Sequence, residues 1–169
     1  MKMRSLMLFG LLSFPLLAHA QQPAAAEVRQ KVARAATAYA SAIACDAQVN
    51  PQNIVPLVPY THMDNRFEAL YAVIWQGDIG CGEGPGTGND NILTVKIGMG
   101  DTYMVDVQES SPMVTFYLPA RFSRVLRHNR DSITVETLEH GPRDANCCPT
   151  VKKQVRMRRD GRGHWSEVK

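Results

Sequence analysis

The 169-residue sequence lacks the short motifs that mark several common catalytic sites. It has no Gly-x-Ser-x-Gly elbow of a serine hydrolase and no His-Glu-x-x-His motif of a zinc protease. Its histidines are scattered and form no close pair that would suggest a metal ligand set or a general base. The motifs therefore predict no catalytic residue, no metal site and no cofactor.

Long apolar runs are absent after the N-terminus, which excludes a membrane-spanning helix in the remainder of the chain. At the N-terminus, basic residues precede an apolar run over residues 6–17 and an Ala-His-Ala cleavage pattern at 18–20. These features predict a cleaved signal peptide over residues 1–20 and a single mature domain over residues 21–169. We expect the mature protein in the periplasm, or secreted, without membrane insertion after cleavage.

The mature chain also lacks a strong charge of either sign. The whole sequence has 19 Lys and Arg against 16 Asp and Glu, and removal of Lys2 and Arg4 lowers its net charge from +3 to +1. Nonspecific nucleic-acid binding needs a broad positive field, so we expect no nucleic-acid partner. A local basic cluster is interpreted as a solvated strand face and turn, in preference to an anionic-ligand site. This cluster comprises Lys152, Lys153, Arg156, Arg158, Arg159 and Arg162.

The four cysteines include no Cys-x-x-Cys pair, which disfavours a zinc site or a redox motif. In an exported protein, an even number of cysteines predicts disulfides. Adjacent Cα atoms lie about 3.8 Å apart, whereas ordinary disulfides need roughly 4.4–6.8 Å, so a bond between Cys147 and Cys148 is the least favoured. We therefore predict that Cys45 and Cys81 each pair with one of these two, in either combination.

Hydrophobic periodicity predicts one amphipathic helix followed by about seven or eight strands. Apolar residues recur at spacings of three and four over about residues 24–44, which is typical of a helix packed on its own domain. Residues 69–75 are apolar on both faces, as in a central strand, and alternating strands follow. Two hairpins over residues 121–138 and 151–168 complete the set.

This order of elements predicts an α+β fold, with the helix packed on one face of a curved antiparallel sheet. A half-open barrel would fit the same pattern. Between the helix and the strands, Asn50-Pro51 and two further prolines predict an extended, irregular stretch.

The most unusual segment is the glycine-rich stretch over residues 77–91, which holds six glycines. A structural loop clamped by a disulfide, a calcium loop and an anion cradle of backbone N–H groups could each explain it. The structural loop is favoured, because the EF-hand spacing and the Gly-Lys-Ser/Thr ending of a phosphate-binding loop are absent. The candidate binding residues of this segment are Asp78, Glu83, Asn89 and Asp90.

A second segment, residues 141–149, contains the adjacent cysteines together with Asp144 and Asn146. Asp and Asn can bond their own backbone and fix turns, so we predict a rigid connection between two strands. Asp144 and Asn146 are the binding candidates here. If the two segments meet in space, their carboxylates could form a pair of the kind that cleaves glycosides. The members of such a pair would come from Asp78, Glu83, Asp90 and Asp144.

Three segments together resemble a family of small, uncharacterised, exported proteobacterial proteins with a GDxGC glycine-rich block and a later NCCP block. They are residues 75–91 (WQGDIGCGEGPGTGNDN), Ser110-Ser111-Pro112 and residues 144–149 (DANCCP). The resemblance covers most of the mature chain, although Thr150 replaces the serine usual after the second block. It implies export and a disulfide between the glycine-rich loop and the Cys-Cys turn, and it implies no catalytic residue.

These observations favour a non-catalytic periplasmic binding or interaction domain with a periplasmic protein partner, such as an envelope enzyme that it inhibits or protects. The alternative is a small envelope hydrolase that acts on peptidoglycan or another glycan through a carboxylate pair. The sequence does not indicate an oligomeric state.

Overall fold

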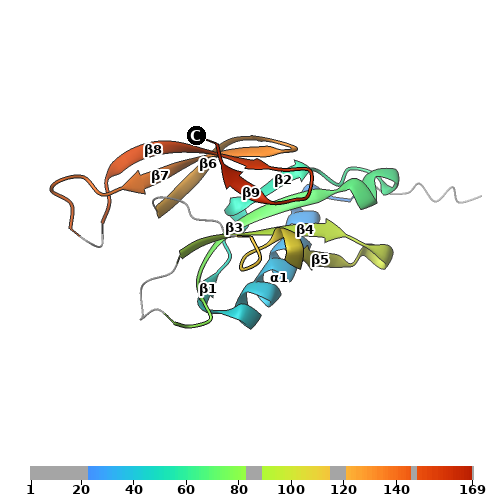
Figure 1. Cartoon of the computed structure of the whole chain (residues 1–169). Coiled ribbons are helices and arrows are strands. Elements are labelled where there is room, and N and C mark those ends of the chain that lie inside the picture. The colour runs from blue at the N-terminus through green and yellow to red at the C-terminus, as the bar shows by residue number, and fades with distance from the viewer. Residues whose placement is uncertain (1–22, 83–88, 115–120, 146–147, 169) are drawn as a thin grey trace, which may run out of the picture.

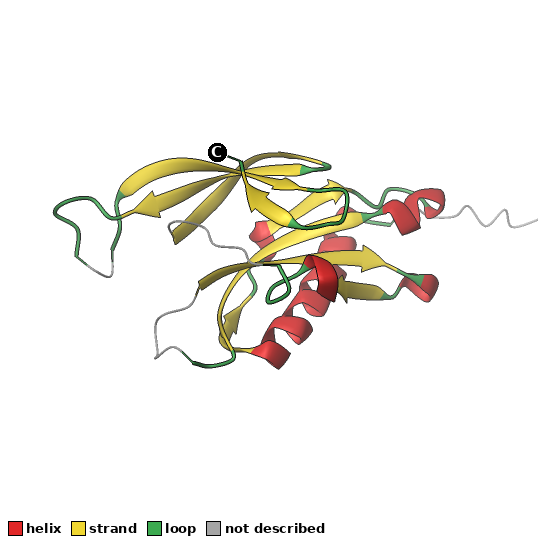
Figure 2. Ribbon diagram, in the orientation of Figure 1, coloured by secondary structure: helices red, strands yellow, loops and turns green. Residues whose placement is uncertain are grey.

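The structure is a computed structural model that describes residues 23–82, 89–114, 121–145 and 148–168. These residues form three layers, in the order helix, five-stranded sheet and four-stranded sheet (Figure 1). Both sheets are antiparallel, and within the described ranges neither closes into a barrel (Figure 2). The α+β prediction is confirmed, but the strands divide into two sheets and do not form one sheet of seven or eight.

The first layer is helix α1 (Ala25–Ile43), which lies within one residue of its predicted bounds. Its many alanines favour the helical state, and Glu27 in the first turn pairs with Lys31 at 2.8 Å. Its buried face, spaced by four residues, consists of Val28, Val32, Ala36 and Ala40. This narrow, small face lets the helix lie close against the sheet.

The middle layer is the five-stranded sheet, built around its central strand β3. Its strands are β1 (Ala44–Gln48), β2 (Ile54–Val58), β3 (Leu70–Ile79), β4 (Asn89–Ile97) and β5 (Tyr103–Asp106). On one side β3 pairs with β4, and on the other side it pairs with β1 and β2 in succession. The stretch predicted to be irregular thus holds the 3-10 turn Pro51–Asn53 and the edge strand β2, and the edge strand β1 precedes it.

Strand β3 is buried on both faces, as its sequence predicts. Leu70, Ala72 and Ile74 belong to the core between the two sheets. The alternate residues, Tyr71, Val73 and Trp75, belong to the core beneath helix α1. Successive side chains of β3 point to opposite faces of the sheet, so this strand contributes to two separate cores.

The third layer has the strand order β6-β7-β8-β9. Its strands are β6 (Arg121–Asn129), β7 (Ser132–Glu139), β8 (Val151–Arg159) and β9 (Trp165–Glu167), so both predicted hairpins are confirmed. The inner face of this sheet packs on the middle layer through Phe122, Ile133, Val135, Val155, Met157 and Trp165.

A buried ion cluster joins the two sheets. Glu109 lies in the 3-10 turn that follows β5, and its two carboxylate oxygens accept hydrogen bonds from Arg159 Nη2 of β8 at 2.6 and 2.7 Å. Lys96 Nζ of β4 donates to the same carboxylate at 2.9 Å. Gly163 lies against this group with φ of 86°, and a Cβ at that position would overlap the carboxyl group.

A disulfide joins Cys45 to Cys81, so the predicted pairing of each with the adjacent cysteines is wrong, as is the link implied by the resemblance. The cause is strand register: Cys45 lies opposite Asp78, and a turn through Gly80 places the two cysteine Cα atoms 5.2 Å apart. Cys148 is also disulfide-bonded, and Cys147 lies outside the described residues. Disulfides fit an oxidising compartment outside the cytosol.

The predicted signal peptide also lies outside the described residues. In the part of the chain that is described, no helix has the length and apolar character needed to cross a bilayer.

Candidate ligand-binding cleft

A polar cleft of about 370 Å³ opens between the two sheets. One wall comes from the connection between β1 and β2 together with β3 and β4, and the other comes from β6. Five of the lining residues carry amide side chains: Gln48, Asn50, Gln52, Asn53 and Gln76. The remaining lining residues are Ile74, Asp90, Phe122, Ser123, Arg124 and Val125.

The amide-rich wall is held in place by local hydrogen bonds and by helix α1. Asn50 Oδ1 accepts a hydrogen bond from Gln52 N at 2.9 Å and so caps the 3-10 turn. Arg29 Nη1, on the helix, donates to the carbonyl oxygen of Pro51 at 2.8 Å. The segment that presents four of the amides is therefore tied both to itself and to the first layer.

Asp90 is the only carboxylate among the described residues that line the cleft. It lies opposite Gln76 in the register of β3 and β4, and Gln76 Nε2 donates to its Oδ1 at 3.1 Å. Its Oδ2 accepts a hydrogen bond from the backbone N–H of Phe122 at 2.6 Å, which links the two sheets. Burial raises the pKa of Asp90, although these hydrogen bonds and Arg121 act in the opposite direction.

Replacement of Asp90 by Asn should make the free energy of unfolding less dependent on pH. Because its pKa is raised in the folded state, Asp90 contributes stability that is full at low pH and is lost as the pH rises from about 3.8 through the folded pKa. An Asn side chain can accept from Phe122 N and, after rotation of the Gln76 amide, can bond to Gln76.

Urea unfolding of both proteins at several values between pH 3.5 and pH 7 checks this expectation. The variant should gain stability relative to the wild type as the pH rises. A difference that is independent of pH, or that changes in the other direction, would contradict it.

Arg124 at the rim of the cleft is paired with a carboxylate of the neighbouring strand. Its Nη2 lies 3.3 Å from Glu136 Oε2, and Ser123 Oγ donates to the other oxygen of Glu136 at 3.4 Å. This pairing offsets the positive charge of Arg124. The cleft therefore offers mainly neutral hydrogen-bonding groups, with a single half-buried carboxyl group among the described lining residues.

Four of the six predicted binding residues lie in the described part of the chain, and one of them, Asp90, lines the cleft. Asn89 precedes it on β4, and its carbonyl oxygen accepts a hydrogen bond from Asn91 Nδ2 at 2.9 Å. Asp78 is buried near the end of β3, beside the disulfide. Glu83 and Asn146 lie outside the described residues.

Asp144 is bonded within its own loop, between β7 and β8. Its Oδ2 accepts hydrogen bonds from the backbone N–H groups of Gly141 at 2.8 Å and Thr150 at 2.7 Å. The bond from Gly141, followed by those from Thr150, lowers the pKa of this carboxyl group. Asp144 thus closes the loop in the way expected of a turn-forming aspartate.

The amide residues of the cleft are not among the binding residues predicted from the sequence. The signal was available, because residues 48–53 (QVNPQN) hold four amides in six positions. The three prolines of the region, at positions 51, 56 and 59, predict irregular backbone and do not indicate which side chains share a cleft. Gln76 lies beside Asp90 because of the β3–β4 register, and this register cannot be predicted from the sequence alone.

The described residues include no group of three or more His, Cys, Asp or Glu side chains that could hold a metal ion.

Comparison with known proteins does not add a function to this geometry. The chain matches no protein-family model, no curated protein and no solved structure.

Proposed function

We propose that the mature chain is a non-catalytic periplasmic binding domain whose cleft between the sheets binds a neutral, hydroxyl-rich ligand, namely a short segment of a glycan. The observation that supports this most is the convergence of five amide residues on one cleft beside a single carboxyl group. Each amide both donates and accepts hydrogen bonds, which matches hydroxyl groups that also do both. A volume of about 370 Å³ is within the range of roughly 300–1,000 Å³ typical of small-molecule sites.

The periplasmic location is supported by two independent features. The sequence predicts a cleaved signal peptide, and the Cys45–Cys81 disulfide requires an oxidising compartment to persist. A role as inhibitor or protective partner of an envelope enzyme stays a prediction from the sequence.

The alternative function is hydrolysis of the same class of ligand. Asp90 has one property of a general acid, because burial raises its pKa. Glycosidases use two carboxyl groups that flank the scissile bond. Among the described lining residues no second carboxylate accompanies Asp90, and this favours binding over cleavage.

Titration calorimetry of the mature protein with chitotriose, maltotriose and a peptidoglycan disaccharide-peptide tests the proposal. We expect saturable binding of at least one of these. Asn53→Ala and Gln76→Ala should each weaken it about 5- to 10-fold, the effect of about one lost hydrogen bond. Gln30→Ala, which removes an exposed amide of helix α1, is the matched control and should bind like the wild type.

Two outcomes would overturn the proposal. One is the absence of heat with all three probes, together with unchanged amide chemical shifts around the cleft. The other is shortened oligosaccharide in the titration mixture, detected by mass spectrometry and lost in Asp90→Asn, which would establish the hydrolase.

A further inference from the structure

The outer face of the four-stranded sheet carries an unusual concentration of positive charge. Directly paired residues of neighbouring strands point to the same face, and the core residues identify the inner one. Six cations occupy outward positions of β6 and β8, together with the neutral Asn129 and Gln154, and these six define what we call the cationic face. They are Arg121, Arg124, Arg127, Lys152, Arg156 and Arg158.

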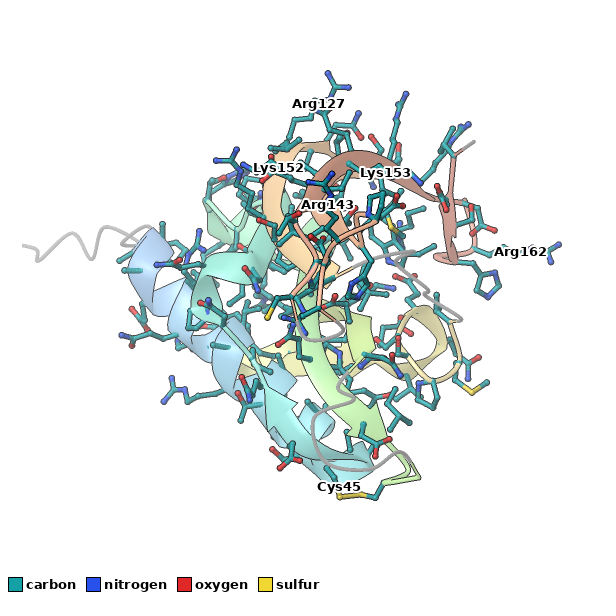
Figure 3. All side chains as sticks on the ribbon, turned by 90° about the vertical axis from the view of Figure 1, so that its left-hand side faces the viewer. Cys45, Arg127, Arg143, Lys152, Lys153 and Arg162 are labelled. Atoms are coloured by element: carbon teal, nitrogen blue, oxygen red, sulfur yellow. A yellow bond between two sulfur atoms is a disulfide. The ribbon has the colours of Figure 1, made fainter. Side chains whose placement is uncertain are left out.

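One acid lies among these outward positions in the described part of the sheet. Glu136 of β7 lies 3.3 Å from Arg124 and 3.7 Å from Lys152, and so accounts for two of the six cations. The other four cations, Arg121, Arg127, Arg156 and Arg158, are exposed and have no carboxylate within 4.0 Å among the described residues. Figure 3 shows Arg127 and Lys152 over this sheet, far from Cys45 at the opposite end of the molecule.

This arrangement costs stability unless a counter-charge is present. Strands lie about 4.8 Å apart, so the rows on β6 and β8 face each other across β7 at about 10 Å and repel. The same chain pairs other cations closely, as in Lys153 with Glu139 at 2.8 Å and Arg159 with Glu109 at 2.6 Å. Other cations of the chain therefore have acidic partners within the protein, whereas most of the cationic face does not. An anion from outside the protein could supply the missing counter-charge.

We propose that the cationic face adsorbs to the surface of an anionic phospholipid bilayer. Clusters of roughly four to eight Lys and Arg bind anionic headgroups, and the open face of a sheet can meet an extended surface. The described outward positions hold no aromatic residue, whereas single-stranded nucleic acid is bound by stacking its bases on aromatic rings. An exported domain meets such bilayers in the envelope, and adsorption needs no membrane insertion.

Sedimentation of the mature protein with vesicles tests this inference. We expect binding to vesicles of phosphatidylglycerol and phosphatidylethanolamine (1:3) at 50 mM NaCl, little binding to phosphatidylcholine vesicles, and release at 500 mM NaCl. The triple variant Arg127→Gln, Arg156→Gln, Arg158→Gln should partition about 100-fold more weakly. Lysine at the same three positions should restore most of the binding, because the charge is retained.

A second triple variant provides the matched control for net charge. Lys31→Gln, Arg34→Gln, Arg162→Gln removes the same number of charges from helix α1 and from the turn between β8 and β9, away from the cationic face, and should bind within about threefold of the wild type. Equal losses in both triple variants, or no binding of the wild type to the anionic vesicles, would overturn the inference. So would tighter binding of a 20-nucleotide single strand than of vesicles at the same salt concentration. Circular dichroism confirms that each variant is folded.

Discussion

Substitution of Glu109 by Gln should lower the free energy of unfolding by about 3 to 5 kcal/mol, because it removes one partner of a buried ion cluster. Glu109 is 7 % exposed, and its carboxylate accepts hydrogen bonds from both Arg159 and Lys96. Without its charge, Arg159, whose side chain is 14 % exposed, stays buried without its counter-ion. The interface between the two sheets then loses the ion pair between Glu109 and Arg159.

Thermal and urea unfolding measure this effect, and a loss of 3 kcal/mol corresponds to a fall of about 10 °C in Tm for a domain of this size. Glu139→Gln is the matched control, because Glu139 forms an ion pair of similar length with Lys153 at the surface. That exposed pair should contribute less than about 1 kcal/mol. Equal effects of the two substitutions would show that the Glu109 cluster is not stabilising the junction of the sheets.

Replacement of both Cys45 and Cys81 by Ser should destabilise the protein by about 4 kcal/mol. The disulfide spans 36 residues, and in the chain-entropy model closure of a loop of that length accounts for this value. It also fixes the start of β1, three residues before Gln48 in the cleft wall. If the cleft binds a glycan as proposed, the variant should therefore lose that binding at a lower temperature than the wild type.

Non-reducing peptide mapping tests the connectivity itself. The peptide that contains Cys45 should be linked to the one that contains Cys81 and separate from it on reduction. Differential scanning calorimetry of the double variant then gives the change in stability. A link from Cys45 to Cys148, or a double variant as stable as the wild type, would contradict the structure at this point.

The local parts of the fold could be predicted, and the long-range parts could not. Helix α1 and the two hairpins of the outer sheet depend on periodicity and turn residues, which are local. Strand β2 was hidden by Pro56, which is tolerated because β2 is an edge strand paired on one side to β3. The division into two sheets depends on which strands pair, and the alternation of apolar and polar residues does not predict the pairing.

The same limit explains the candidate sites. Asp90 was identified because it belongs to an unusual segment, whereas its partners Gln76 and Phe122 come from other strands. The basic cluster is one group along the sequence, but neighbouring residues of a strand point to opposite faces of the sheet. Arg158 therefore lies outward while Arg159 enters the ion cluster, and the outward row is completed by arginines of β6.

The two-sided burial of β3 has a consequence for how the molecule unfolds. Loss of the helix would expose Tyr71, Val73 and Trp75 to water, and loss of the outer sheet would expose Leu70, Ala72 and Ile74. If either outer layer detaches, one face of the central strand is exposed to solvent. The stability of each core therefore depends on the other core. This coupling favours a single cooperative transition over stepwise melting of the layers.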